Sequence, residues 1–471
     1  MSERFVFGYG TSHQAAVAPA VGGFHPHVVR GDAPVSRVEL DRDAFDWAFF
    51  GLLAFTTMLF FRPQDAIPAL QPLHLAEVAA LVALVAMVTG RLGRGLTVTR
   101  VTPEVVGVVA FGGLILATAP FSVWRGGAIG TFTDLYSKVL LVVILMVNTL
   151  RSPRRIEQVT WLIVVATGYL ASRAVLDYAR GENLVENGRV RGAVGGMFRN
   201  PNDLALNMVT VLPFAVSIAL GRRRLIGRAI AAGCAGVMLV TVVLSHSRSG
   251  SIGLVIAMLV FAGLLVRRRP GVVAAGVLAA VMALPLVPSS YWHRLSSITD
   301  QTQDDTGSRE ARSILLRESY AAFLAHPLTG VGAGQFKNYD PDGRQEAWRE
   351  SHNVMLQVAA ELGVFGLLAF AFLVVRAGIA GGQTRGLLRR AGPALEEDQR
   401  LDAHSRAATA AFAGWFVCAL FASVAYNWTF YYLLALAIAP REVLLDRRRP
   451  YRSGRIAGLQ PGSSELRGVR A

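Results

Sequence analysis

Long apolar runs recur along the chain, and their length constrains the fold more than any other feature of the sequence. An α-helix needs about 20 mostly apolar residues to cross the roughly 30 Å of hydrocarbon in a bilayer. The runs are continuous rather than alternating, which favours helices over membrane-spanning strands. The sequence therefore predicts an all-α polytopic membrane protein with about 12 transmembrane helices. They are expected at residues 45–61, 75–90, 104–120, 135–149, 156–176, 203–220, 226–244, 250–266, 271–287, 353–375, 407–424 and 429–445.

Basic residues alternate between the segments that connect these runs. With the N-terminus inside, the inner segments carry about twice as many Lys and Arg residues as the outer ones, as the positive-inside rule requires. Three Arg-Arg-Arg triplets, at 222–224, 267–269 and 447–449, all fall on the inner side. The pattern predicts cytoplasmic N- and C-termini. It also accounts for the net charge of +15, so no nucleic-acid partner is expected.

This topology divides the chain into five parts. Residues 1–44 lack the apolar core of a signal peptide and are predicted to form a disordered cytoplasmic tail. Helices 1–9 are expected within 45–287 and helices 10–12 within 353–445, followed by a cytoplasmic tail at 446–471. The polar segment 288–352 then becomes a large periplasmic loop between helices 9 and 10. Most of the candidate chemistry lies in or beside this loop.

The periplasmic position excludes several kinds of active site. ATP and nucleotide sugars are normally absent from that side, so a group transfer there needs a donor that is already activated and carried by the membrane. Gly330–Gly334 lacks the Gly-Lys-Ser/Thr ending of a phosphate loop and is expected to be a turn. Histidines do not recur at metal-ligand spacing, and Cys234 and Cys418 lie inside apolar runs as packing residues. We expect neither a metal nor a cofactor.

His352 lies where the large loop meets the tenth predicted helix. That helix begins outside the membrane, so its positive end faces the loop and disfavours a charged imidazole. A neutral imidazole can accept a proton from a hydroxyl group, which makes His352 a candidate catalytic residue. The alternative interpretation is an interfacial histidine beside Asn353, which would cap the helix.

Arg248 lies in the short outer turn Ser-His-Ser-Arg-Ser-Gly, at residues 245–250. The eighth predicted helix starts there, so its free N–H groups point outward and favour an anion. An arginine beside them matches a phosphate group bidentately. The alternative is an interfacial arginine that reaches lipid headgroups.

Arg312 lies in a helix that we expect in the outer loop, at about residues 308–325. Leu316, Tyr320 and Phe323/Leu324 follow it at helical spacing, which places Arg312 on an apolar face near the membrane. A cation on such a face needs an anionic partner. That partner could be a bound anion, or an acidic residue of the same loop such as Asp304 or Asp305.

Two further polar groups have simpler interpretations. Arg173 and Asp177 are one helical turn apart and are expected to form a structural ion pair. Asn202 or Asp203 follows Asn200-Pro201 at the start of the sixth predicted helix, where it would act as a helix cap.

Four motifs together resemble the O-antigen ligase and polymerase family. They occur in the family's order within residues 198–366, and Arg312 stands where the family usually has arginine, although Leu316 replaces a tryptophan often seen four residues later. The motifs are Phe198–Ala205, Ser247–Gly250, His326–Phe336, and His352-Asn353 followed by Gly363 and Gly366.

The resemblance implies a metal-independent glycosyltransferase with a GT-C-like membrane fold in a bacterial inner membrane. Such enzymes transfer a glycan from undecaprenyl diphosphate to an acceptor hydroxyl on the periplasmic face. Arg248 and Arg312 would then bind the diphosphate, and His352 would orient or deprotonate the acceptor. Asn353, Asn202 and Arg199 would support them.

The shared motifs leave the acceptor open. A ligase would use lipid A-core or a protein hydroxyl, whereas a polymerase would extend a carrier-linked glycan, as in O-antigen or exopolysaccharide synthesis. A transporter or flippase for lipid-linked glycan is a different class. It is disfavoured because the connection at 221–225 between the sixth and seventh runs is short, where many two-half transporters have a long inner connection. The oligomeric state stays open.

Overall fold

The computed structural model describes residues 46–62, 67–185, 188–192, 198, 200–221, 224–286, 289, 291–292, 308–341, 349–390 and 395–448. The predicted N-terminal tail lies outside these residues, as do Arg199 and the predicted C-terminal tail beyond residue 448. Besides helices and the loops that join them, the described chain contains one short hairpin, in which β1 (Leu184–Val185) pairs antiparallel with β2 (Arg189–Val190).

Each of the twelve predicted runs overlaps a helix. Nine helical segments in the described part of the chain are long and apolar enough to cross a membrane, while α2 and α12 are apolar but shorter. α16 starts with charged residues and does not meet that criterion. A polytopic helical membrane protein is thus confirmed in outline. The helices are α2 Trp47–Phe61, α4 Leu75–Leu92, α5 Pro103–Thr118, α6 Arg125–Gly130, α7 Ser137–Thr149, α8 Pro153–Arg180, α9 Pro201–Ala219, α10 Leu225–Leu244, α11 Arg248–Leu265, α12 Pro270–Ala283, α14 Ser308–Ala325, α15 Val354–Arg389, α16 Glu396–Ala419 and α17 Trp428–Arg448.

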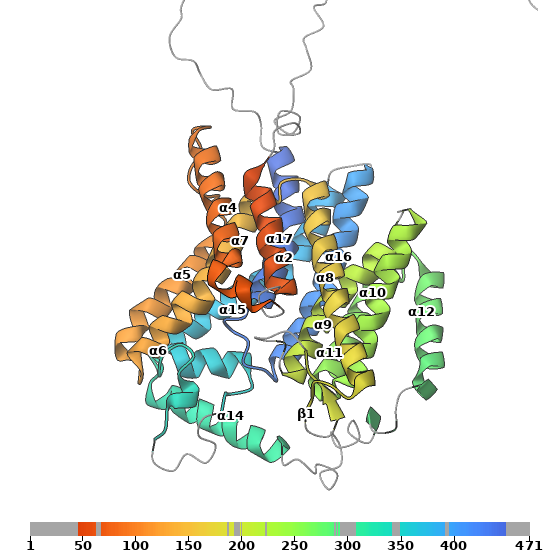
Figure 1. The fold of residues 1–471 in the computed structure, drawn as a ribbon. Coiled ribbons are helices and arrows are strands. Elements are labelled where there is room, and N and C mark those ends of the chain that lie inside the picture. The colour runs from red at the N-terminus through yellow and green to blue at the C-terminus, as the bar shows by residue number, and fades with distance from the viewer. Residues whose placement is uncertain are drawn as a thin grey trace, which may run out of the picture. The chain divides into compact units, whose positions relative to one another are not determined.

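Burial separates central helices from peripheral ones. In α17, 89% of the apolar window is buried, compared with 17% in the segment that contains α4. No described residue of α12 is buried, and α12 stands at the edge of the bundle (Figure 1). The amino-acid compositions of the helices agree with this difference in burial. α17 carries aromatic, hydroxyl and charged groups that need protein partners, whereas α12 is almost wholly aliphatic. Tyr431 and Trp415 are among the largest fully buried side chains.

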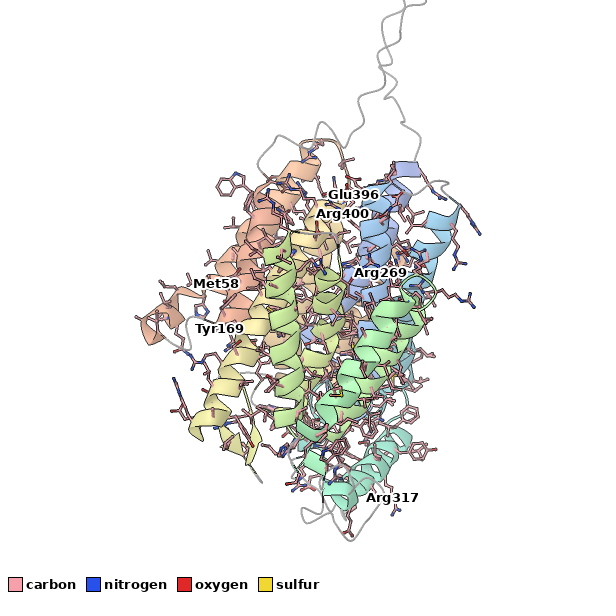
Figure 2. All side chains as sticks on the ribbon, turned by 90° about the vertical axis from the view of Figure 1, so that its right-hand side faces the viewer. Met58, Tyr169, Arg269, Arg317, Glu396 and Arg400 are labelled. Carbon is pink, nitrogen blue, oxygen red and sulfur yellow. The ribbon has the colours of Figure 1, made fainter. Side chains whose placement is uncertain are left out.

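Two ends of the bundle can be distinguished. We call the end at which α9, α11 and α15 begin the loop end. α14 lies across this end, below the spanning helices in the view of Figure 1. Arg317 of α14 lies at the loop end, whereas Arg269, Glu396 and Arg400 lie toward the opposite end (Figure 2).

Residues 376–406 connect the tenth and eleventh predicted runs, yet most of them are helical. α15 continues to Arg389, and α16 begins at Glu396. The two helices pack closely, since Ser405 Oγ donates to the Gly381 carbonyl at 3.0 Å and a Cβ on Gly381 would lie 2.1 Å from Thr409 Oγ1. Small residues at this crossing explain why a sequence rich in Gly and Arg forms packed helices.

A buried ion-pair network joins three helices toward the opposite end. Glu104, at the start of α5, is fully buried and lies 2.6 Å from Arg376 of α15 and 2.9 Å from Arg441 of α17. Arg441 also pairs with Glu442 at 2.8 Å. Charges removed from water need such partners, so the network fixes α5, α15 and α17 relative to one another.

We expect Glu104→Gln to destabilise the protein by about 3–5 kcal/mol, because it leaves Arg376 and Arg441 with an unbalanced buried charge. Glu77→Gln is the matched control. Its pair with Lys138 is 47% exposed on both sides and should contribute only about 0–1 kcal/mol. Thermal unfolding in detergent measures both, and similar midpoints for the two variants would contradict a structural role for the network.

Candidate functional site

His352 is held rigidly just before α15. Its backbone is left-handed, with φ +50°, and its N–H donates to Ser423 Oγ at 3.0 Å. Asn353 caps the helix, since its Oδ1 accepts from the N–H groups of Met355 and Leu356, both at 3.0 Å. The capping role of Asn353 is confirmed, and the left-handed residue before it sets the direction of the imidazole.

The imidazole of His352 is kept neutral by its surroundings. Burial, and to a smaller extent the positive charges of Arg312 and Arg349, lower the pKa of His352 to about 4. The neutral form agrees with the prediction, but the main cause is desolvation rather than the helix end alone. This effect also places Arg312 and Arg349 within electrostatic reach of His352.

Arg312 reaches this site because α14 packs on the first part of α15. Leu315 and Ala322 of α14 are buried together with Val331, Phe336 and Ala360. Ser319 of α14 is also buried, and Arg312, Leu315, Ser319 and Ala322 share one face of the helix. The expected helix in this loop is confirmed. The predicted stripe of Leu316, Tyr320 and Leu324 is instead 37–58% exposed, and the alternative partners Asp304 and Asp305 lie outside the described residues.

The loop at residues 330–336 binds to a break in α15. The N–H groups of Val331 and Gly332 donate to the carbonyls of Ala360 and Glu361, each at 2.9 Å. The buried carboxylate of Glu361 accepts from the Gly334 N–H at 2.9 Å. The loop is therefore a turn, as predicted, and these N–H groups are occupied by α15.

Gly363 forms the break itself. Its φ of 65° and ψ of −163° belong to a region that only glycine adopts readily. The Val364 N–H turns outward and donates to the Pro327 carbonyl at 2.8 Å. The backbone groups released by the break thus find new partners in the 327–332 segment, as they must inside a membrane protein. This contact joins two of the sequence motifs, His326–Phe336 and the one that contains Gly363.

The segment between α5 and α7 also binds the loop at residues 330–336. Ser122 Oγ donates to the Val331 carbonyl at 3.1 Å, and Thr131 Oγ1 donates to the Ala333 carbonyl at 3.0 Å. Sequence reasoning missed these residues, and it also missed Glu361. A carboxylate inside an apolar run was a signal for Glu361, whereas nothing local marks Ser122 or Thr131.

Arg248 is the first residue of α11, and its Nε atom is buried. Ser247 caps the helix by accepting from the Gly250 N–H at 3.2 Å, and its Oγ donates to Asn202 Oδ1 at 2.9 Å. The sixth and eighth predicted helices therefore meet at this turn. The predicted cap of α9 was wrong, because Asn200 accepts from the Asn202 N–H and leaves the Asn202 side chain for Ser247.

The predicted ion pair between Arg173 and Asp177 is also wrong. Arg173 is exposed, whereas Asp177 is buried and accepts from Asn183 Nδ2 at 2.8 Å. Residues one helical turn apart are close in space, but Asp177 bonds instead to Asn183, which follows α8.

The Arg248 turn and His352 border the same end of α16. Cys418 Sγ donates to the Ser249 carbonyl at 3.4 Å, next to Arg248. A few residues later, the Leu420 carbonyl accepts from Asn353 Nδ2 at 3.1 Å, and Ser423 accepts from His352. The fold thus brings together a cationic turn and a neutral histidine that are far apart in sequence. Within the described residues, no group of three or more His, Cys, Asp or Glu side chains could hold a metal ion.

Comparison with known proteins agrees with the motifs. Residues 233–371 match a protein-family model described as O-antigen ligase. The match runs from α10 into α15 and includes Arg248, Arg312 and His352. It confirms the family resemblance that the sequence predicts. No curated protein matches the chain.

Gly363→Ala should destabilise the protein by at least about 1–3 kcal/mol, because alanine adopts this backbone conformation only under strain. Its Cβ would also lie 2.6 Å from the Leu328 carbonyl carbon. Gly382→Ala in the same helix is the control, since open space surrounds Gly382 and alanine should stabilise a helix by up to about 1 kcal/mol. Thermal unfolding in detergent should shift in opposite directions, and equal shifts would contradict the role given to the break.

Proposed function

From the O-antigen ligase match we propose that the protein transfers a glycan from undecaprenyl diphosphate to an acceptor hydroxyl. The reaction would occur at the periplasmic face of a bacterial inner membrane, in cell-surface polysaccharide synthesis. One observation carries the proposal: the Arg248 turn and the Arg312–His352 pair both border the end of α16. This juxtaposition supplies cations for a diphosphate and a neutral base for a hydroxyl.

The distribution of basic residues gives the proposed membrane topology. The loop end would face the periplasm, and both termini would face the cytoplasm, with about 12 spans in a GT-C-like arrangement. The polyprenyl tail of the donor would stay in the bilayer, and the surrounding lipid would be a partner of the exposed apolar helices. The acceptor would be lipid A-core, a protein or a growing glycan.

The proposed chemistry balances without a metal ion. The bond between the anomeric carbon and the diphosphate oxygen breaks, and the acceptor oxygen forms the new glycosidic bond. Arg248 and Arg312 bind the diphosphate and stabilise the charge that develops as it leaves. His352 accepts the hydroxyl proton. Asn353 orients His352, Asn202 supports Arg248, and Arg199 is assigned to the same support by its motif alone.

The proposal is tested by an in-vitro transfer assay. Purified protein receives undecaprenyl-diphosphate glycan, EDTA and no nucleotide sugar, and the products are separated by length and by attachment. Glycan on lipid A-core or protein supports a ligase, and a longer carrier-linked glycan supports a polymerase. Movement of the donor across vesicles, with no product from any acceptor, would overturn glycan transfer in favour of transport.

Two arginines of α14 provide a matched pair for the diphosphate role. Arg312→Ala should lower kcat/KM by about 100-fold or more, as expected for loss of one group that stabilises developing charge. Arg317 is exposed on the same helix, so Arg317→Ala should retain activity. Arg248→Ala should behave like Arg312→Ala. Full transfer by well-folded Arg248→Ala and Arg312→Ala proteins would remove the diphosphate role.

The pH dependence should report His352. Because its folded pKa is about 4, well below the ordinary value of about 6.5, the free enzyme should keep a neutral imidazole down to about pH 4. The acid limb of kcat/KM should therefore fall near pH 4 rather than near pH 6.5. His352→Ala should lose about 100- to 10,000-fold in rate, whereas His74→Asn, at an exposed histidine, should not. An acid limb that persists unchanged in His352→Ala would exclude His352 as its source.

A further inference from the structure

Arg189 is a buried cation beside the Arg248 turn. It is the first residue of β2, in the hairpin that follows α8, and only 9% of it is exposed. Its Nε donates to the Ser245 carbonyl at 3.1 Å, and its Nη2 donates to Asn202 Oδ1 at 2.9 Å. One planar guanidinium thus binds the end of α10 and the start of α9 at once.

The contacts of Arg189 continue to Arg248. Asn202 Oδ1 accepts from Arg189 and also from Ser247 Oγ at 2.9 Å. Ser247 caps α11, and Arg248 is the next residue. Ser245, whose carbonyl Arg189 binds, and Ser247 are both almost fully buried. Arg189 therefore fixes the turn from both sides of His246.

We propose that Arg189 is a positioning residue that sets the α10–α11 turn so that Arg248 meets the donor diphosphate. The inference rests on the proposed function and extends it to a residue outside the four sequence motifs. A lysine could keep the charge, but it lacks the rigid fork that reaches Ser245 and Asn202 together. Geometry, rather than charge alone, is what Arg189 contributes.

The test measures binding of undecaprenyl diphosphate to purified protein in detergent, so that it does not depend on turnover. Arg189→Lys should weaken binding by about tenfold, because the bidentate geometry is lost while the charge remains. Arg191→Lys is the matched control on the same hairpin, and it should bind like the wild type. Wild-type affinity in Arg189→Lys would overturn the inference.

A double-mutant cycle identifies the route of the effect. If Arg189 acts through Arg248, the double variant Arg189→Lys/Arg248→Ala should bind no more weakly than Arg248→Ala alone. Effects that multiply would mean that Arg189 acts independently, and would overturn the inference. If Arg189→Lys does not fold, Asn202→Ala breaks the same link, and its effect on binding should also vanish in an Arg248→Ala background. An unchanged affinity in folded Asn202→Ala would overturn the inference.

The same experiment separates this inference from the proposed function. Wild-type protein that does not bind undecaprenyl diphosphate, or that binds it equally well without Arg248, would overturn the donor role itself. Binding that requires Arg248 but not Arg189 would leave the donor role standing and remove only the positioning role.

Discussion

The break in α15 at Gly363 is the constraint on which the loop end depends. A helix inside a membrane protein must keep its backbone groups hydrogen-bonded, because unpaired groups are costly in hydrocarbon. The break releases the carbonyls of Ala360 and Glu361 and the N–H of Val364, and the 327–332 segment binds all three. A polar loop is thereby fixed to a spanning helix by its backbone. The first part of α15, which begins beside His352, takes its direction from this exchange.

Charge is handled differently at the two ends of the bundle. Toward the opposite end, Glu104, Arg376, Arg441 and Glu442 satisfy one another directly, and buried pairs of this kind fix helices without needing a ligand. At the loop end, the positive charges of Arg312 and Arg349 act on the neutral imidazole of His352. Their positive charges disfavour protonation of His352, so its imidazole stays neutral beside two cations.

Periodicity and local motifs were enough to predict where most helices lie, including α14, because each depends on neighbours in sequence. The extension of α15 to Arg389 and the start of α16 at Glu396 were not predicted. The family motifs also pointed to segments that the fold brings together. Long-range partners were not predictable in this way. Asn200 rather than Asn202 caps α9 because Asn202 is needed by Ser247, and Asp177 binds Asn183 rather than Arg173. Arg189 becomes significant only when the segments it binds are known, and the partners of Glu361 also lie in a distant segment.

The two proposed diphosphate ligands belong to different packed units. Arg248 is fixed by α9, the β-hairpin and the end of α16, through Asn202, Ser247 and Cys418. Arg312 is fixed to the first part of α15 by the small core beneath α14. These units meet where His352 and Asn353 bind the end of α16. The position of Arg312 relative to Arg248 therefore depends on the direction of α15 before Gly363. Under the proposed function, a change at the break should weaken donor binding even though it touches neither arginine.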